Sequence, residues 1–231
     1  MLAILDRYVP ALKEGDVVAV TSKIVALCQG RVVPKDGATS KNDLIRQEAE
    51  WFVEHASPHS KKITIAIKEG MLIASAGIDE SNVKQQYVLW PSQPQQAAAA
   101  IWAHLKKRDG LHHLGVILTD SQTHPLRWGV MGVGLAWCGF RPLWDCRGTQ
   151  DIWGQALRVT TMNVLDGLAA SAVIMMGESA EQTPIAIVHD APYVRFSDVP
   201  PTKQDTQALR IAQQDDLYAP LLQSVEWKKG G

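Results

Sequence analysis

The sequence predicts a mixed α/β (α+β) protein, because strand-like and helix-like segments are interspersed along the chain. Short β-branched or alternating runs, which are typical of strands, occur at 17–20, 63–67 and 114–118. Apolar residues at helical spacing occur at 160–176. Interspersed strands and helices of this kind are typical of α/β and α+β domains.

In the first part of the chain, local patterns predict two helices and three strands. Apolar residues at helical spacing predict a helix over 4–12, and a β-branched run predicts a strand over 17–20. Helical spacing also predicts a helix over 40–55. Isoleucines alternate with other residues at 63–67, which predicts a strand, and a second strand is expected at 71–76.

In the second part, a proline near the start and a glycine just past the end bracket an alanine-rich helix over 94–108. The apolar run 114–118 predicts a buried strand. Residues 121–158 are rich in Gly, Trp and Arg and show no clean period, which is typical of a functional or interfacial segment. A helix is expected at 160–176 and a strand at 185–188.

The domain organisation is expected to be simple. No proline-rich linker divides the 231 residues. We therefore expect one domain over residues 1–200, followed by a polar tail over 201–231 with a short helix around 205–214.

Composition excludes several classes of protein. With 23 basic and 24 acidic side chains, the chain lacks the clustered basic excess that nucleic-acid binding needs. No apolar run approaches the roughly 20 residues of a membrane span, and the first residues have no signal-peptide layout. Three cysteines without a CxxC pair are expected to be reduced thiols. A cytoplasmic location is therefore expected.

Two acids lie where an apolar strand is expected to end. Asp79 follows the strand at 71–76, and Asp120 follows the strand at 114–118. Two carboxylates that converge repel each other unless a cation lies between them, and hard oxygen ligands suit Mg²⁺ or Mn²⁺. The alternative is that each aspartate caps a turn. The spacing alone leaves the two readings balanced.

Two segments are candidates for phosphate binding. The glycine-rich stretch 129–134 is not framed by a P-loop or a GxGxxG unit, so tight turns or close backbone packing explain its glycines at least as well. Ser22 and Lys23 follow a strand and offer a hydroxyl, backbone N–H groups and one cation. A solvated lysine in a turn is the equally plausible alternative.

The remaining polar groups carry weaker signals. Neither zinc-ligand spacing nor a GxSxG elbow occurs, which disfavours a zinc enzyme and a serine hydrolase. Arg127 and Arg147 stand in the irregular segment and could clamp a carboxylate or phosphate. The alternative is a structural ion pair, for example with Asp145 or Asp151. The seven histidines considered as zinc ligands are His55, His59, His104, His112, His113, His124 and His189.

Several segments together resemble one known family. They are GDVVAVTSKIV with QGRVV (15–33), SAGIDESN (75–82), GVILTDS (115–121), PLRWG (125–129), GFRPLWDCRGTQDIWG (139–154), VTTMNVLDGLAASAVIMMGE (159–178) and TPIAIV (183–188). As an ordered set they resemble the coenzyme F420-0:L-glutamate ligases. With YVLWP (87–91) and GESAEQTP (177–184), they are most similar to a shorter bacterial branch named for folate metabolism γ-glutamate ligases. The likeness covers about residues 1–200.

The resemblance implies formation of an amide bond to L-glutamate, driven by GTP or ATP with Mg²⁺ or Mn²⁺. The metal ligands that it implies are Asp79, Asp120, Ser121 and Glu178. The residues that it implies for nucleotide binding are Ser22, Lys23, Asn82, Met176 and Gly177. Arg127 and Arg147 are the expected catalytic cations. The resemblance also implies an F420 ligase-like fold with mixed sheets and an intertwined homodimer.

Two motifs of this chain differ from the corresponding motifs of the F420 ligases. Leu27 stands where their motif has a lysine, and Gln122, Thr123 and His124 replace Phe, Gly and Arg. These differences favour a folate- or pterin-type acceptor, to which glutamate is added through an acyl phosphate. One alternative is a GTP-dependent coenzyme F420-0:L-glutamate ligase. The other is a relative that binds a nucleotide or pterin without ligating it, and the presence of three acids in the motifs argues against it.

Overall fold

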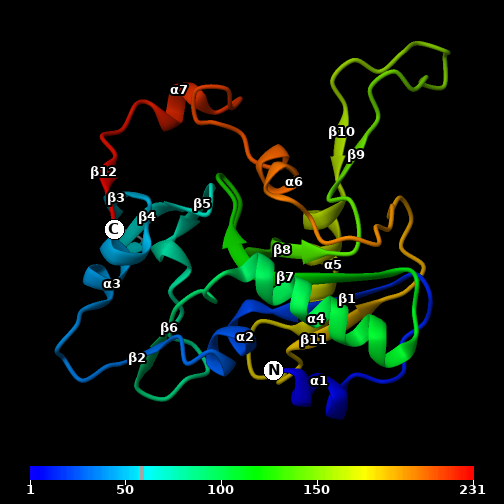
Figure 1. Cartoon of the computed structure of the whole chain (residues 1–231). Helices are drawn as coiled ribbons and strands as arrows, with labels where there is room; N and C mark the ends of the chain where they lie inside the picture. The colour runs from blue at the N-terminus through cyan, green and yellow to red at the C-terminus, as the bar shows by residue number, and fades with distance from the viewer. Residues whose placement is uncertain (58–59) are drawn as a thin grey trace. The chain divides into compact units, whose positions relative to one another are not determined.

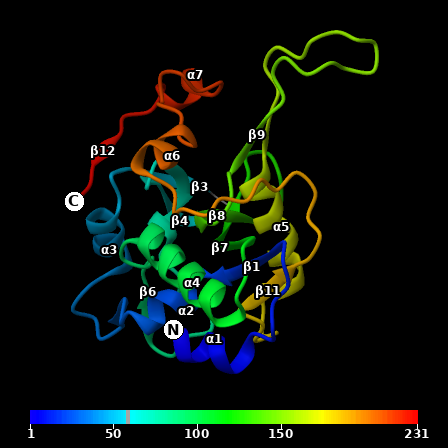
Figure 2. The ribbon, with the colours of Figure 1, turned by 45° about the vertical axis from the view of Figure 1, so that its right-hand side comes forward.

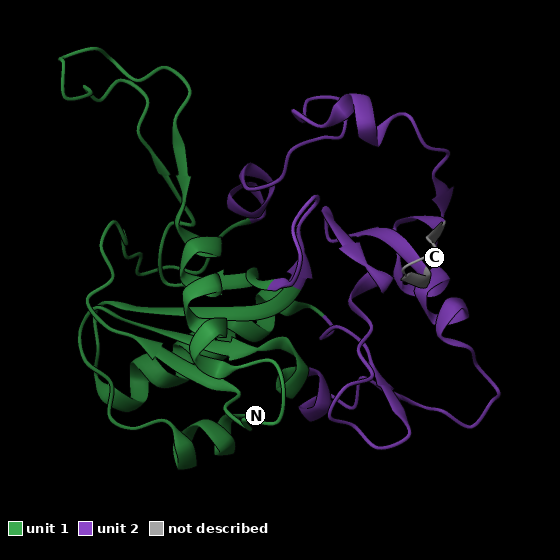
Figure 3. Cartoon of the chain, turned by 180° about the vertical axis from the view of Figure 1, so that it is seen from behind, with its two compact units in different colours: residues 1–25, 93–121, 131–202 green, residues 26–92, 122–130, 203–231 purple. Residues whose placement is uncertain are grey.

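The computed structural model describes residues 1–57 and 60–231, and the chain divides into two compact units (Figures 1 and 3). Unit 1 consists of residues 1–25, 93–121 and 131–202, and unit 2 consists of residues 26–92, 122–130 and 203–231. Each unit therefore combines segments that lie far apart in the sequence. Residues 203–231 belong to unit 2 together with 26–92 and 122–130, and the division into one domain over 1–200 and a tail over 201–231 stays a prediction.

Each unit contains the following helices and strands, given in chain order. Unit 1 contains α1 (Leu2–Tyr8), β1 (Asp16–Thr21), α4 (Pro94–Asp109), most of β7 (Leu114–Thr123) and of β8 (Val130–Cys138), β9 (Leu143–Asp145), β10 (Thr161–Asn163), α5 (Val164–Met176) and β11 (Ile185–Val188). The last two residues of β7 and the first residue of β8 belong to unit 2. Unit 2 contains β2 (Val32–Pro34), α3 (Lys41–Glu48), β3 (Trp51–Ser57), β4 (Ser60–Lys68), β5 (Met71–Ala74), the 3₁₀ turn η1 (Ser75–Gly77), β6 (Gln86–Val88), α6 (Lys203–Ala208), α7 (Ala219–Leu222) and β12 (Lys228–Lys229). Helix α2 (Ser22–Cys28) begins in unit 1 and ends in unit 2.

A four-stranded sheet in the order β11-β1-β7-β8 forms the centre of unit 1. β1 pairs in parallel with β7, with Thr21 opposite Thr119 at the end of the pairing, and antiparallel with β11. β1 and the first part of β7 are buried, as expected for strands that are covered on both faces. The parallel pairing brings the residues after Thr21 and Thr119 to the same edge of the sheet.

Helices α4 and α5 lie on opposite faces of this sheet (Figures 1 and 2). On one face, the indole N–H of Trp102 in α4 donates a hydrogen bond to the carbonyl oxygen of Leu114 at 2.8 Å. On the other face, Val173 and Met176 of α5 pack with Ala19 of β1 in a buried cluster. The sheet is thus enclosed by apolar side chains on both sides, which confirms the mixed α/β class.

The helix predicted over 94–108 is confirmed almost to the residue. Pro94 is the first residue of α4, where its missing N–H is not needed, and Gly110 ends the helix with φ 66°. Left-handed φ values of this kind are open to glycine at little steric cost. Lys106, Lys107 and Arg108 occupy the last turn, where cations interact favourably with the helix dipole.

Strand β8 lies inside the segment 121–158, where no period predicts it. Its two interior glycines face α5. A Cβ atom on Gly132 would lie 2.5 Å from the carbonyl oxygen of Ala169, and one on Gly134 would lie 2.4 Å from Cγ of Leu165. The N–H of Gly134 also donates to Asp166 Oδ1 at 2.8 Å. Close backbone packing is therefore confirmed as the reason for these glycines, since a side chain would hold the helix off the sheet.

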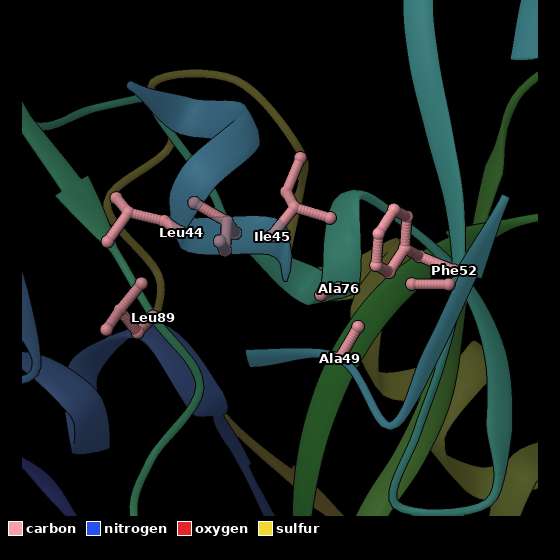
Figure 4. Packing of buried hydrophobic residues seen from close by; sticks show 8 residues of the cluster. Leu44, Ile45, Ala49, Phe52, Ala76 and Leu89 are labelled. Atoms are coloured by element: carbon pink, nitrogen blue, oxygen red, sulfur yellow. The ribbon is translucent and has the colours of Figure 1, made fainter. Parts of the chain in front are cut away.

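The helix predicted over 40–55 is wrong in its second half. α3 starts as expected with a capping box between Ser40 and Asp43, but it ends at Glu48, and the chain continues as strand β3. Ile45 of α3 and Phe52 of β3 belong to the same buried cluster (Figure 4). Ile45 and Phe52 show helical spacing in the sequence because both elements bury these side chains in one core. Sequence periodicity cannot distinguish this arrangement from a single helix.

Other boundaries shift by a few residues. The helix predicted over 160–176 begins at Val164, because residues 161–163 form β10 and Asn163 caps the helix by accepting from the Asp166 N–H. The helix predicted over 4–12 ends at Tyr8. β7 does not stop before Asp120 but continues to Thr123, so Asp120 lies within the strand.

The C-terminal tail takes part in the sheet of unit 2, whose order is β12-β3-β4-β5. Lys228 and Lys229 pair with Phe52 and Trp51, and the Gly230 N–H donates to the Glu50 carbonyl oxygen at 3.0 Å. The short helix expected around 205–214 is present as α6, which starts and ends earlier.

Among the described residues, no helix has the length and apolar character that crossing a bilayer requires. Cys28, Cys138 and Cys146 are free thiols, as expected.

Candidate active site

A group of oxygen-bearing side chains lies toward the end of β7 in unit 1. Asp120 and Ser121 are consecutive residues of β7, and Glu178 follows the glycine that ends α5. The Ser121 hydroxyl donates a hydrogen bond to Glu178 Oε1 at 2.5 Å, and Asp120 Oδ1 accepts one from the Ser121 N–H at 2.8 Å. Two predicted metal ligands that are 57 residues apart in the sequence are thus in direct contact.

The end of α5 positions Glu178. Met176 is buried, and its sulfur lies 3.9 Å from the hydroxyl oxygen of Thr119, which ties the last turn of α5 to β7. Gly177 has φ 78°, a left-handed value that favours glycine and ends the helix. Met176 is therefore a core residue in this structure, and contact of Met176 and Gly177 with the nucleotide remains a prediction.

Ser22 and Lys23 begin helix α2 directly after β1. Because Thr21 and Thr119 are opposite each other in the parallel pair, Ser22 and Asp120 follow at the same edge of the sheet. Ser22 is buried, and Lys23 is partly exposed. Backbone N–H groups at a helix start, together with a lysine, favour phosphate. The predicted phosphate contact is compatible with this placement and remains a prediction.

In unit 2, Asp79 is held by a tight turn made with the residues that follow it. Its Oδ1 accepts hydrogen bonds from the N–H groups of Glu80 at 2.6 Å and Ser81 at 2.7 Å, and its Oδ2 accepts from the Ser81 hydroxyl at 3.1 Å. Asn82 is exposed, with φ 56°. Asp79 belongs to unit 2 and Asp120 to unit 1. That the two bind one metal centre remains a prediction.

The two predicted catalytic arginines differ in their surroundings. Arg147 makes two hydrogen bonds to Asp145, from Nε at 2.9 Å and from Nη2 at 2.7 Å. These bonds lower the pKa of Asp145 to about 2. The structural ion pair considered for Arg147 is therefore present, and with Asp145 rather than Asp151. Arg127 lies exposed in the segment between β7 and β8.

Two of the histidines are paired with aspartates outside this group of residues. His104 pairs with Asp6 at 2.6 Å, and His189 Nδ1 pairs with Asp16 Oδ1 at 2.6 Å. His59 lies outside the described residues. Within 1–57 and 60–231, no three or more His, Cys, Asp or Glu side chains form a group that could hold a metal ion.

The oxygen atoms at the end of β7 nevertheless fit the chemistry of a hard cation. Asp120 and Glu178 supply carboxylates, and Ser121 supplies a hydroxyl. Oxygen donors of this kind are those that Mg²⁺ and Mn²⁺ prefer. These three residues are the ones that would hold such an ion in unit 1.

Gln122, one of the residues at which the chain differs from the family motif, carries a further polar group at this end of β7. The side-chain Oε1 of Gln122 is buried and has no hydrogen-bond partner among the described residues. Buried acceptors are normally satisfied, so a bound donor is a natural partner for this atom. In the sequence, the signal for a role of Gln122 at this site is its position directly after Ser121.

Comparisons with known proteins identify the family of this chain. Residues 2–190 match the family model described as F420-0:Gamma-glutamyl ligase. The chain is 30% identical over 208 residues to a coenzyme F420:L-glutamate ligase of Methanococcus maripaludis (strain C7), covering 84% of this chain and 82% of that protein. It is 33% identical over 193 residues to the protein of the same name in Methanopyrus kandleri, covering 76% and 75%. The chain belongs to the F420-0:gamma-glutamyl ligase family and is a ligase that forms a carbon–nitrogen bond.

Proposed function

We propose that this γ-glutamyl ligase joins L-glutamate to the terminal carboxylate of an F420-0-type acceptor, using GTP or ATP. The observation that carries the proposal is the contact between Ser121 and Glu178 beside Asp120. The names of the relatives supply the acceptor, because both relatives described above are coenzyme F420:L-glutamate ligases.

The reaction requires activation, because a carboxylate does not react with an amine at neutral pH. In the proposed route, an oxygen of the acceptor carboxylate takes the γ-phosphoryl group, and the nucleoside diphosphate leaves. The glutamate amine then attacks the acyl carbon, and inorganic phosphate leaves with the C–O bond electrons. Such phosphoryl transfer depends chiefly on positioning and charge neutralisation.

The chain's own residues supply the charges for these steps. Asp120, Glu178, Ser121 and Asp79 are the proposed metal ligands, and a bound Mg²⁺ or Mn²⁺ would neutralise charge on the phosphates. Ser22 and Lys23 are proposed to contact phosphate, and Asn82, Met176 and Gly177 to contact the rest of the nucleotide. Because Arg147 is already paired with Asp145, Arg127 is the stronger candidate for holding the carboxylates of glutamate.

The proposed acceptor is the one that the sequence analysis gave as the alternative. Leu27 and the residues 122–124 favoured a folate or pterin acceptor, with F420-0 as the alternative. The relatives named above support the alternative better. The folate-type acceptor remains the second candidate because of those sequence differences. A non-catalytic binder does not agree with membership of a ligase family.

A single assay tests the acceptor. The purified protein is incubated with Mg²⁺ or Mn²⁺, L-glutamate, either GTP or ATP, and one of F420-0, folate or dihydropteroate, and the products are identified by mass. We expect a gain of one or more glutamyl units on F420-0. A gain on a pterin alone would transfer the proposal to the folate branch, and no gain on any acceptor would contradict it.

We also propose that the protein acts as a homodimer, as the resemblance implies. The segment between β9 and β10 projects from the rest of unit 1 (Figures 1 and 2). In the turn between the bridged residues Gln150 and Ala156, Ile152 and Trp153 are 91% and 81% exposed. Monomeric proteins rarely expose contiguous apolar patches of large side chains. The segment between β9 and β10, called the arm below, is therefore the proposed contact with a second copy.

The double variant Ile152→Ser/Trp153→Ser tests this contact. Because apolar burial stabilises such interfaces, we expect the variant to dissociate at concentrations where the unmodified protein is dimeric. The mass is measured by light scattering after size exclusion. Leu217→Ser, which replaces an exposed leucine outside the arm, is the control and should leave the mass unchanged. A dimer of undiminished stability in the double variant would contradict the proposal.

A further inference from the structure

We propose that Trp90 is a positioning residue for Asp79, because its indole ring fixes the strained turn that leads to this aspartate. The inference rests on the proposed role of Asp79 as a metal ligand. All of the residues concerned lie in unit 2.

The turn before Asp79 has an unusual backbone. Ser75, Ala76 and Gly77 all have positive φ, at 55°, 50° and 72°. Two of them are not glycine, and residues with a Cβ pay a steric penalty in the left-handed region. Such conformations persist where the surrounding structure holds them, and they often mark functional sites. The N–H of Ile78 closes the turn by donating to the Ser75 carbonyl oxygen at 2.9 Å.

Trp90 lies directly against this turn. A Cβ atom on Gly77 would lie 2.1 Å from Trp90 Nε1 and 2.4 Å from its Cε2, so the edge of the indole occupies the space next to the glycine. Trp90 is 2% exposed. The strand before it is also bonded to the aspartate, because Asp79 and Val88 exchange two backbone hydrogen bonds of 2.9 Å each. The turn therefore contacts the side chain of Trp90, and the aspartate that follows the turn is bonded to the backbone of the strand before Trp90.

A partly buried charge cluster also contacts Trp90, at the face of its ring and at its backbone carbonyl. Lys68 Nζ lies 5.3 Å from the centroid of the Trp90 ring, and Arg31 Nε donates to the Trp90 carbonyl oxygen at 3.0 Å. Glu48 joins the two cations, accepting from Arg31 at 2.7 Å and from Lys68 at 2.6 Å. Lys68 is 9% exposed, so these interactions are poorly screened by water. The ring is thus contacted by Lys68 at its face and by the turn at its edge.

The chain contains a matched pair elsewhere that serves as a control. In unit 1, Trp102 lies against Gly139, which has φ 84°, and a Cβ on Gly139 would lie 2.2 Å from Trp102 Nε1. This tryptophan is also buried, at 7% exposed. No predicted metal ligand adjoins Gly139 in the sequence. A general effect of losing a buried indole can therefore be separated from an effect on Asp79.

The first experiment measures amide hydrogen exchange in peptides covering residues 78–83. The N–H groups of Glu80 and Ser81 are protected through Asp79, so their exchange reports on the turn whether or not a metal binds. In Trp90→Phe, which keeps an aromatic face near Lys68, we expect exchange there to rise about tenfold. Trp102→Phe should leave these amides unchanged within about twofold. Equal protection in Trp90→Phe and the unmodified protein would overturn the proposal.

Gly77→Ala tests the same contact from its other side. The added methyl must displace the indole, so we expect faster exchange at residues 78–83 in this variant as well. In the double variant Gly77→Ala/Trp90→Phe, the smaller ring makes room for the methyl group. The rise in exchange should therefore be smaller than the product of the two single effects. A rise equal to that product would show that the two residues act independently and would overturn the proposal.

The second experiment links the turn to the metal. Mn²⁺ is titrated in the presence of GTP, with electron paramagnetic resonance detecting the free ion. We expect the half-saturating Mn²⁺ concentration to rise about three- to tenfold in Trp90→Phe, with kcat at saturating Mn²⁺ nearly retained, because Asp79 is displaced and not removed. Trp102→Phe should not change it.

Asp79→Asn separates this inference from the proposed function. If Asp79→Asn binds Mn²⁺ as the unmodified protein does, the metal role of Asp79 fails even though Trp90→Phe loosens the turn. If Asp79→Asn weakens Mn²⁺ binding but Trp90→Phe changes neither exchange nor Mn²⁺ binding, the proposed function stands and the positioning role of Trp90 fails.

Discussion

Asp120→Asn is expected to abolish ligation while leaving the fold intact. The substitution keeps the size of the side chain and an oxygen acceptor for the Ser121 N–H, so the local hydrogen bond can persist. It removes the negative charge that a divalent cation would require at the proposed metal site. Loss of charge neutralisation in phosphoryl transfer is worth several kcal/mol, so we expect turnover to fall by about 10³-fold or more.

The measurement is glutamyl transfer at saturating metal and nucleotide, together with thermal unfolding. The melting temperature should shift by no more than about 2 °C, since the change is isosteric. Asp198→Asn is the matched control, because Asp198 is an exposed aspartate that pairs with Lys106 at 2.7 Å, away from the proposed ligands. It should retain full activity. Turnover by Asp120→Asn close to that of the control would exclude Asp120 as a metal ligand.

Gly132→Ala is expected to destabilise unit 1 by about 1–3 kcal/mol, which is typical of overpacking in a core. The added Cβ would lie 2.5 Å from the carbonyl oxygen of Ala169 and 2.6 Å from Cγ2 of Val173. The first is a backbone atom inside α5, so the contact cannot be relieved by rotating a side chain. The helix must move away from β8, which also disturbs the packing that positions Glu178.

Urea unfolding measures this loss through the midpoint at constant slope. Gly167→Ala is the control, because Gly167 lies in α5 with nothing within 4 Å of an added Cβ. Alanine at that position should stabilise the helix by up to about 1 kcal/mol. If Gly132→Ala were as stable as the unmodified protein, α5 would not pack on β8 as closely as described.

How much of the fold the sequence predicts depends on how local each signal is. β1, α4 and β11 are marked by their own residues, through β-branched runs, caps and charged ends. β8 has no such local pattern, because Gly132 and Gly134 are required for its close contact with α5 and interrupt the strand pattern. The continuation of 40–55 as one helix fails for a related reason: Ile45 and Phe52 meet in one core from two different elements.

For the site, the sequence by itself determined that Asp79 and Asp120 are acids near the ends of apolar strands, and that the ordered motifs belong to a ligase family. Local periodicity and motif spacing carry that information. The tertiary structure alone decided that Ser121 touches Glu178, that Arg147 is engaged by Asp145, and that Trp90 lies against Gly77. The contacts of Ser121 with Glu178 and of Trp90 with Gly77 join residues that are far apart in the chain. They depend on how whole helices and strands pack, which no local pattern records.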